Sequence, residues 1–226
     1  MQTTKKIFLL LLTFTSITVN GQNHFWGVKS GVNYTNITAK NAFGDEDFRT
    51  GLIVGITYDY FFRKHFSIGA DVVYNQRGSM PNIIYDDNSG SPTGQKGIFK
   101  LNYDYVTVPL KVGYNYGTTF YRFANIGLTP SILVDAKTFI PSIVPAETVL
   151  PAEIHNVKNR VNQFDIGGFV EIGGGYKFQN RLWGFLSFSY QHSLTTFTNL
   201  DYFANIQARH YGISVNLGLK YALSGE

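Results

Sequence analysis

Downstream of Gln22, apolar and polar residues alternate with a period of two in one segment after another. No sustained helical repeat of 3.6 residues interrupts this alternation, so the chain is predicted to be all-β. The last segment is the clearest, because apolar residues occupy every second position from Tyr211 to Leu223 while His210, Ser214 and Lys220 share the other face. Comparable patterns predict eight strands, at 26–38, 50–62, 66–77, 104–115, 120–136, 163–178, 181–193 and 210–223.

The lengths of the predicted strands and of their connections favour a membrane barrel. Each strand has about ten to fifteen residues, whereas strands of globular sheets usually have ~5–6 and a tilted membrane strand needs ~9–11. Short and long connections alternate, which predicts an eight-stranded antiparallel up-and-down transmembrane β-barrel with short periplasmic turns and long external loops. The predicted turns are 63–65, 116–119 and 179–180, and the predicted long loops are 39–49, 78–101, 137–162 and 194–208.

The N-terminal segment has the three parts of a secretory signal peptide. Lys5 and Lys6 form a basic region, and an unbroken apolar run follows at 7–12. The segment ends at Val19-Asn20-Gly21, with residues of small or moderate size before the cleavage site. The apolar run is too short for a membrane-spanning helix, which needs ~20 residues. We therefore expect cleavage before Gln22.

This division makes residues 1–21 a signal peptide and 22–226 a single barrel domain. The formal net charge of +4 falls to +2 without the two lysines of the signal, which has no acidic residue. So weak a bias predicts no nucleic-acid partner. The chain has no Cys, and its five His are scattered without paired spacing, so no metal site and no cofactor are predicted.

A soluble barrel of the lipocalin type is the main alternative fold, because its strands also alternate with a period of two. The two folds differ in which face meets water. The apolar faces here carry almost no charge through the middle of each strand, and aromatic residues such as Tyr34, Tyr58, Tyr114 and Tyr211 lie near strand ends. Aromatic girdles at both interfaces are typical of barrels in a bilayer, so we expect the apolar faces to contact outer-membrane lipid.

Four segments of the sequence resemble the outer-membrane β-barrel proteins of the PorT-like family. The resemblance extends from the signal to Tyr221 and is specific for the barrel but weak for any activity. It rests on Trp26-Gly-Val-Lys-Ser-Gly-Val-Asn-Tyr, Tyr105-Val-Thr-Val-Pro-Leu-Lys-Val-Gly-Tyr, Phe164-Asp-Ile-Gly-Gly-Phe-Val-Glu-Ile-Gly-Gly-Gly-Tyr and the terminal Gly218-Leu-Lys-Tyr.

The resemblance implies a location in the outer membrane of a Gram-negative bacterium. It also implies an aromatic residue near the C-terminus that serves insertion by the barrel-assembly machinery, and Tyr221 fits that role. The tail at 222–226 departs from the pattern, since such signals usually end the chain. One member of the family is associated with a protein-secretion system, and we do not carry that role over to this chain.

The face predicted to line the lumen holds most of the charged residues of the strands. Buried ions are tolerated when they are paired and hydrogen-bonded, so an internal polar network is expected around Lys29, Asp71, Lys111 and Glu171. Lys111 and Glu171 are one pair that could meet across the lumen, and Asp71 and Asp165 are other acids that could pair with Lys111. The remaining charges predicted on this face are Asp59, Arg77, Asp135, Asp165, Lys177 and Lys220.

The sequence favours a structural or interaction role without catalytic activity. Loops 78–101 and 137–162 are unusually apolar for solvated segments, so they either fold over the barrel mouth or contact a protein partner. A narrow gated pore is an alternative role for the charged lumen.

A lipid-modifying enzyme is a further alternative, and no catalytic residue is assigned for it. Its candidate side chains would come from His192-Ser193 at the external rim, and a nucleophile needs a base within hydrogen-bonding reach. The residues that could approach this pair are Glu153, His155, Asp201 and His210.

Overall fold

The computed structural model describes residues 24–39, 46–86, 92–142, 151–178, 181–199 and 207–223. The predicted signal peptide lies outside these residues. Among them, no helix is long and apolar enough to cross a membrane. The described elements are β1 (His24–Ala39), β2 (Glu46–Phe61), β3 (Phe66–Asp86), β4 (Pro92–Ile98), β5 (Lys100–Thr107), β6 (Leu110–Gly117), β7 (Phe120–Ile140), β8 (Glu153–Asn156), the 3-10 helix η3 (Lys158–Arg160), β9 (Phe164–Lys177), β10 (Leu182–Ser193) and β11 (Ala208–Leu223).

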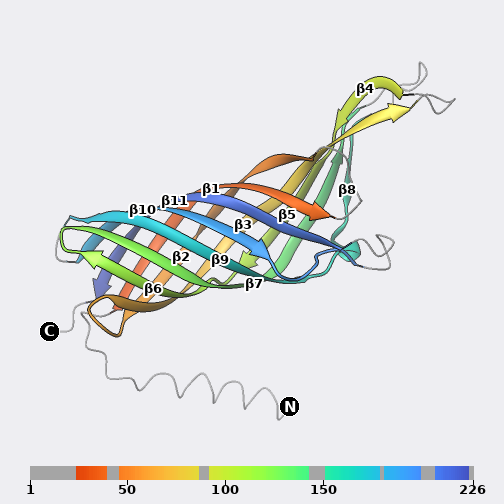
Figure 1. Cartoon of the computed structure of the whole chain (residues 1–226). Coiled ribbons are helices and arrows are strands. Elements are labelled where there is room, and N and C mark those ends of the chain that lie inside the picture. The colour runs from red at the N-terminus through yellow and green to blue at the C-terminus, as the bar shows by residue number, and fades with distance from the viewer. Residues whose placement is uncertain are drawn as a thin grey trace, which may run out of the picture.

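The strands close into an antiparallel barrel with eight positions around the ring (Figure 1). The order is β2, β1, β11, β10, β9, β7, then β5 and β6 together, then β3, which pairs with β2 and closes the ring. Pairing of β1 with β11 aligns His24 with Leu223, so the first strand starts where the last strand ends. The predicted eight-stranded up-and-down barrel is confirmed.

The predicted strand 104–115 is divided into β5 and β6, which occupy one position of the ring. Pro109 separates them, because proline has no N–H to donate to the ladder. Backbone hydrogen bonds still cross this point, since Val108 N donates to Pro130 O at 2.8 Å and Asp71 N donates to Pro109 O at 3.0 Å. The division therefore leaves the barrel wall continuous.

Two predicted loops are wrong over much of their length. In place of the loop 78–101, β3 continues to Asp86 and pairs with β4, and Phe99 N donates to Pro81 O. In place of the loop 137–162, β7 continues to Ile140 and pairs with β8. Proline and short apolar runs in these segments obscure the alternation of apolar and polar residues. The segments still form strands, because the extended ends of β3 and β7 pair with β4 and β8. Residues 87–91 and 143–150 lie outside the described part.

In the strands of the ring, most apolar side chains point outward and most polar side chains point into the lumen. Leu217 is 62% exposed, whereas Asp71 and Asp165 on lumen-facing positions are 1% and 0% exposed. A soluble barrel would have the opposite arrangement, since water would surround its outer face. The outward apolar band is the surface of a transmembrane barrel, and the lipocalin-like alternative is therefore wrong.

Aromatic side chains border the apolar band at both ends, which matches the predicted girdles. Those at the end with the short turns include Trp26, Tyr58, Tyr114, Tyr176 and Tyr221, and those at the other end include Tyr34, Phe48, Tyr190 and Tyr211.

Asp135 is the one predicted lumen charge whose face the described structure reverses. The register between β5 and β7 shifts at Asp104 and Tyr105. The side chains of Leu133 and Ala136 are therefore both buried, although their residue numbers differ by three. A bulge of this kind shifts the alternation by one residue. The Asp135 carboxylate consequently lies on the outer surface, 2.6 Å from the Lys137 ammonium.

Candidate functional site

A chain of alternating positive and negative groups fills the lumen in its periplasmic half. The Lys29 ammonium lies 2.5 Å from Asp71, and the Lys111 ammonium lies 2.7 Å from Asp71 and 3.0 Å from Asp59. Lys220 completes the chain at 2.6 Å from Asp59. We call these five residues the inner cluster. The structure thus brings three of the four predicted network residues, Lys29, Asp71 and Lys111, into direct contact.

The glycines on the lumen face make room for these long side chains. At Gly69 a Cβ atom would lie 2.5 Å from the Asp59 Oδ1 and 2.6 Å from the Lys111 Cε. At Gly113 it would lie 2.2 Å from the Asn125 Oδ1. All three distances are shorter than ordinary van der Waals contact, so a side chain at either position would displace the network. The abundance of glycine in the strands thereby permits a narrow lumen to hold charged residues.

Glu171, the fourth predicted network residue, has neutral partners. Asn125 Nδ2 donates to its Oε2 at 2.6 Å, and Ser187 Oγ donates to its Oε1 at 2.8 Å. The predicted ion pair between Glu171 and Lys111 is wrong, because the Lys111 ammonium binds Asp71, Asp59 and the Thr57 hydroxyl. Asp71 on β3 and Asp59 on β2 contact Lys111, because β3 pairs with β6, which holds Lys111, and β2 pairs with β3.

A second charged cluster, which we call the outer cluster, lies toward the external end. The Arg77 guanidinium binds the Asp165 carboxylate at 2.8 Å, and both side chains are at most 3% exposed. Arg77 also donates to Thr107 and Ser131, each at 3.0 Å. Sequence phase places both charges on the lumen face, but the separation of 88 residues between them gave no sign that they would pair.

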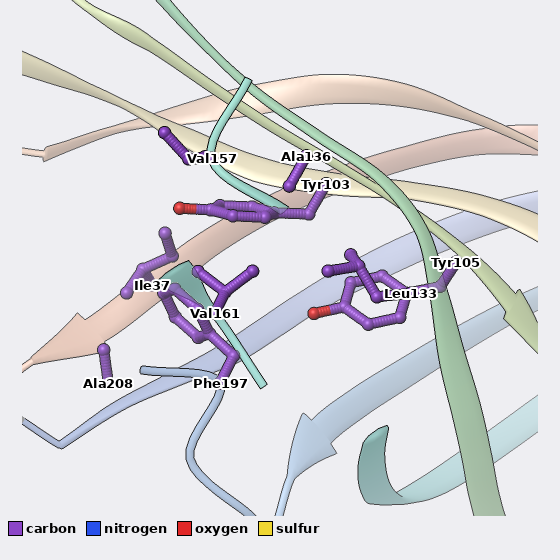
Figure 2. Packing of buried hydrophobic residues seen from close by; sticks show 9 residues of the cluster. All are labelled: Ile37, Tyr103, Tyr105, Leu133, Ala136, Val157, Val161, Phe197 and Ala208. Atoms are coloured by element: carbon purple, nitrogen blue, oxygen red, sulfur yellow. The ribbon is translucent and has the colours of Figure 1, made fainter. Parts of the chain in front are cut away.

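Aromatic and aliphatic side chains close the lumen beyond each cluster. At the periplasmic end Phe25, Trp183, Tyr121, Phe123 and Phe185 pack inside the barrel, with ring centroids 4.5 Å apart for Phe25 and Trp183. This group is the periplasmic plug. The external plug is the buried cluster of Ile37, Tyr103, Tyr105, Leu133, Ala136, Val157, Val161, Phe197 and Ala208 (Figure 2).

Segments between strands build part of the external plug. Val157 and Val161 flank η3, and Phe197 follows β10, so parts of the predicted loops 137–162 and 194–208 fold into the mouth. Phe197 stacks on the imidazole of His210 with ring centroids 4.2 Å apart. Asn162 N donates to Phe197 O, which joins the two segments to each other. Phe197 N donates to Ala208 O of β11, which joins the plug to the barrel wall.

Two small cavities lie in the lumen between the two plugs. One cavity of about 20 Å³ is bordered by Arg77 and His210, and another of about 30 Å³ is bordered by Lys29, Glu171 and Asn216. A buried water needs about 10–15 Å³ of such space, so each cavity has room for at least one water. Arg77 Nε, His210 Nδ1 and Asn216 Oδ1 have no protein partner, and these are the atoms such waters would satisfy.

The side chains considered for a lipid-modifying site do not converge. The Ser193 hydroxyl donates to Asp165 at 2.8 Å inside the lumen, whereas His192 contacts the Tyr190 and Tyr211 rings on the outer girdle. Glu153 and His155 pair with each other on β8 at 2.8 Å, and Asp201 lies outside the described residues. His210 is buried in the external plug. Within the described ranges no three potential ligands gather in a way that could hold a metal ion.

Tyr221, the residue predicted to serve membrane insertion, lies on the outer face of β11. It is opposite Trp26 in the pairing with β1, and Arg181 donates to its hydroxyl at 3.5 Å. It therefore belongs to the periplasmic girdle. Its proposed recognition by the assembly machinery stays a prediction.

Three solved structures are similar to this chain over most of their length. Neisserial surface protein A is 11% identical, with 88% of this chain and 96% of that chain covered and a TM-score of 0.44. OprG from Pseudomonas aeruginosa is 10% identical, with 92% and 100% covered and a TM-score of 0.47. The attachment invasion locus protein Ail of Yersinia pestis is 9% identical, with 87% and 99% covered and a TM-score of 0.38. No curated protein matches the sequence.

The family follows from a match over most of the chain. Residues 20–199 match the model of the outer membrane protein beta-barrel domain. The outward apolar band, the two girdles and the closed antiparallel ring agree with that description and with a location in the outer membrane. This chain belongs to the family of outer membrane proteins with that beta-barrel domain.

Proposed function

We propose that the protein is a closed, non-catalytic barrel that presents a projecting β-sheet to a protein partner outside the cell. One observation carries this proposal: β3, β4, β5, β7 and β8 continue beyond the apolar band and form a sheet that projects from the barrel mouth (Figure 1). From Ser79, which is opposite the girdle residue Phe48, β3 runs on to Asp86, which is about 23 Å of strand at ~3.3 Å per residue.

The projecting sheet has features that favour a protein partner. Ile98 on β4 and Ile154 on β8 are 48% and 68% exposed, although they lie outside the band that lipid covers. In the described part of the chain β8 pairs with β7 alone, so its other edge has free backbone donors and acceptors. Exposed apolar side chains beside an open strand edge are the means by which sheets bind other chains.

The packed lumen supports the closed state over the gated pore. Both plugs and both charged clusters would have to rearrange before an ion could pass. Planar-bilayer recordings are expected to show negligible conductance. Steady single-channel conductance would favour the pore, and removal of the plug residue Phe185 by Phe185→Ala would then be expected to raise it.

Crosslinking in intact cells tests the interaction role. A photoreactive residue at Ile154 or Ile98 is expected to give discrete adducts with another protein. A matched probe at Ile126, which is 63% exposed on the lipid-facing side, is expected to give none. Equal adducts at Ile126 and Ile154 would count against a partner specific to the projecting sheet.

Three finer assignments belong to the same proposal. The four quoted motifs support a place among the PorT-like proteins, without a role in secretion. The N-terminal pattern supports cleavage before Gln22, and the position of Tyr221 in the last strand supports insertion by the barrel-assembly machinery.

A further inference from the structure

The exposed charged residues described at the periplasmic rim are all basic. The end with short turns is periplasmic in an up-and-down outer-membrane barrel. Arg63, Lys64, Arg122 and Arg181 are exposed there, and outside the lumen the described part of this end has no acidic residue. The external end differs, because Asp135 and Lys137, for example, neutralise each other.

Arg122 is the cation of this rim that lies on the lipid-facing wall. It is on β7, opposite Tyr116 of β6 and Gly174 of β9. Within the described ranges its guanidinium has no hydrogen bond or ion pair. A Cβ atom at Gly174 would meet nothing closer than the Tyr121 carbonyl oxygen at 3.4 Å, so the surface beside Arg122 is open.

An apolar groove crosses the outer wall, and Gly174, which lines it, is the pairing partner of Arg122. Gly174 and Gly184 lie in it, between larger side chains of which Phe120, Tyr176, Leu186 and Leu217 are examples. The groove extends across β7, β9, β10, β11, β1 and β2, which is about 24 Å at ~4.8 Å per strand.

The strands of such barrels tilt by ~35–45°, so a groove that crosses them rises obliquely from the rim. A span of about 24 Å at that angle covers about 15 Å of depth, which is half of a ~30 Å hydrocarbon core. The groove therefore matches the depth of one leaflet, with its charged end at the periplasmic interface.

We propose that Arg122 and this groove bind one anionic glycerophospholipid of the periplasmic leaflet. The guanidinium binds the phosphate through paired N–H donors, which suit phosphate geometry better than a point charge does. One acyl chain lies over Gly174 and Gly184. The unneutralised basic rim selects a lipid with a net negative headgroup over a zwitterionic one. This site is independent of the projecting sheet and of any partner bound there.

Native mass spectrometry of the full barrel in mild detergent tests the charge selection. The probes are phosphatidylglycerol and phosphatidylcholine with identical acyl chains. One surface cation contributes about a fivefold preference for an anionic lipid, so wild type is expected to retain phosphatidylglycerol at least fivefold better. Arg122→Gln is expected to lose about fivefold of this preference, and Arg209→Gln, which removes an exposed cation at the other end, is expected to keep it.

Glycine substitutions test the groove separately. Gly174→Leu fills the groove and is expected to lower retention of both lipids. Gly168→Leu is the matched control, because Gly168 is on the same strand and outside the groove, and a Cβ atom there would meet nothing within 4 Å. Heat-dependent gel mobility verifies that each variant is folded, and Gly174→Ala replaces the leucine variant if that one fails.

Three results would overturn the proposal. The first is an unchanged phosphatidylglycerol preference in folded Arg122→Gln. The second is equal loss of lipid in Gly174→Leu and Gly168→Leu. The third is a dimer, in place of bound lipid, that Gly174→Leu dissociates, since the groove would then contact a second copy of the chain.

Discussion

The inner and outer clusters of the lumen hold their buried charges in different ways. The inner cluster distributes two aspartates among three lysines, so each carboxylate has two cationic partners. The outer cluster has one pair, Arg77 and Asp165, and hydroxyl groups complete its hydrogen bonds. Buried charges are costly when a partner is removed. The inner cluster therefore has a spare counter-ion for each carboxylate, and the outer cluster has none.

Charge balance strengthens this contrast. The three lysines and two aspartates of the inner cluster leave one positive charge, and Glu171 on the same lumen face supplies the negative charge that balances it. The outer pair is neutral by itself. Asp165 receives further hydrogen bonds from Ser193 and Thr195 at 2.8 and 2.6 Å, so polar neighbours surround it but no second cation does.

The largest effect is expected for Arg77→Met. It leaves the Asp165 carboxylate, which is 0% exposed, without a counter-ion, and such a loss costs roughly 3–5 kcal/mol. Guanidinium-induced unfolding in vesicles measures the change in the free energy of unfolding. Lys137→Met, which removes an exposed cation from a surface pair, is the control and is expected to cost less than about 1 kcal/mol. Equal costs for the two variants would refute the assigned importance of the outer pair.

A smaller effect is expected for Lys111→Met in the inner cluster. Lys29 still neutralises Asp71 at 2.5 Å, and Lys220 still neutralises Asp59 at 2.6 Å, so two complete pairs remain. The cost is that of hydrogen bonds lost by buried carboxylates, about 1–3 kcal/mol. The same unfolding measurement applies. A loss as large as that of Arg77→Met would show that the additional lysine gives no redundancy.

The alternation of residues was sufficient to predict the ring of strands and the face of most charges, because a period of two assigns each side chain to one side of a wall. It was insufficient where the backbone departs from regularity. The irregularity near Tyr105 moved Asp135 to the outer surface, and Pro109 divided one strand into two. Pro109 is visible in the sequence and is a residue that interrupts strands, whereas no Pro or Gly next to Tyr105 or Asp135 marks the irregularity there.

The sequence also does not predict which charged side chains pair with each other inside the lumen. Phase places Lys111, Asp71, Asp59 and Glu171 on one face, but which of them meet depends on the stagger between strands. The periplasmic plug illustrates the same limit. Phe123 and Phe185 occupy lumen-facing positions in strands whose outer faces are also apolar, so their inward direction follows only from the observed pairing.

The smallest effect is expected for Glu171→Gln, which tests how much a buried carboxylate with neutral partners contributes to the stability of the barrel. The amide keeps one oxygen for the Ser187 hydroxyl, and the Asn125 amide can rotate to accept from the new NH₂ group. The cost is therefore about that of one hydrogen bond, roughly 0.5–1.5 kcal/mol. Glu171 and Lys111 share no direct contact, whereas Asp71 and Lys111 do. The double-mutant cycle of Glu171→Gln with Lys111→Met is therefore expected to give a smaller coupling energy than the cycle of Asp71→Asn with Lys111→Met. Equal coupling in the two cycles would mean that charge across the lumen, and not contact between neighbouring strands, determines which groups stabilise the barrel.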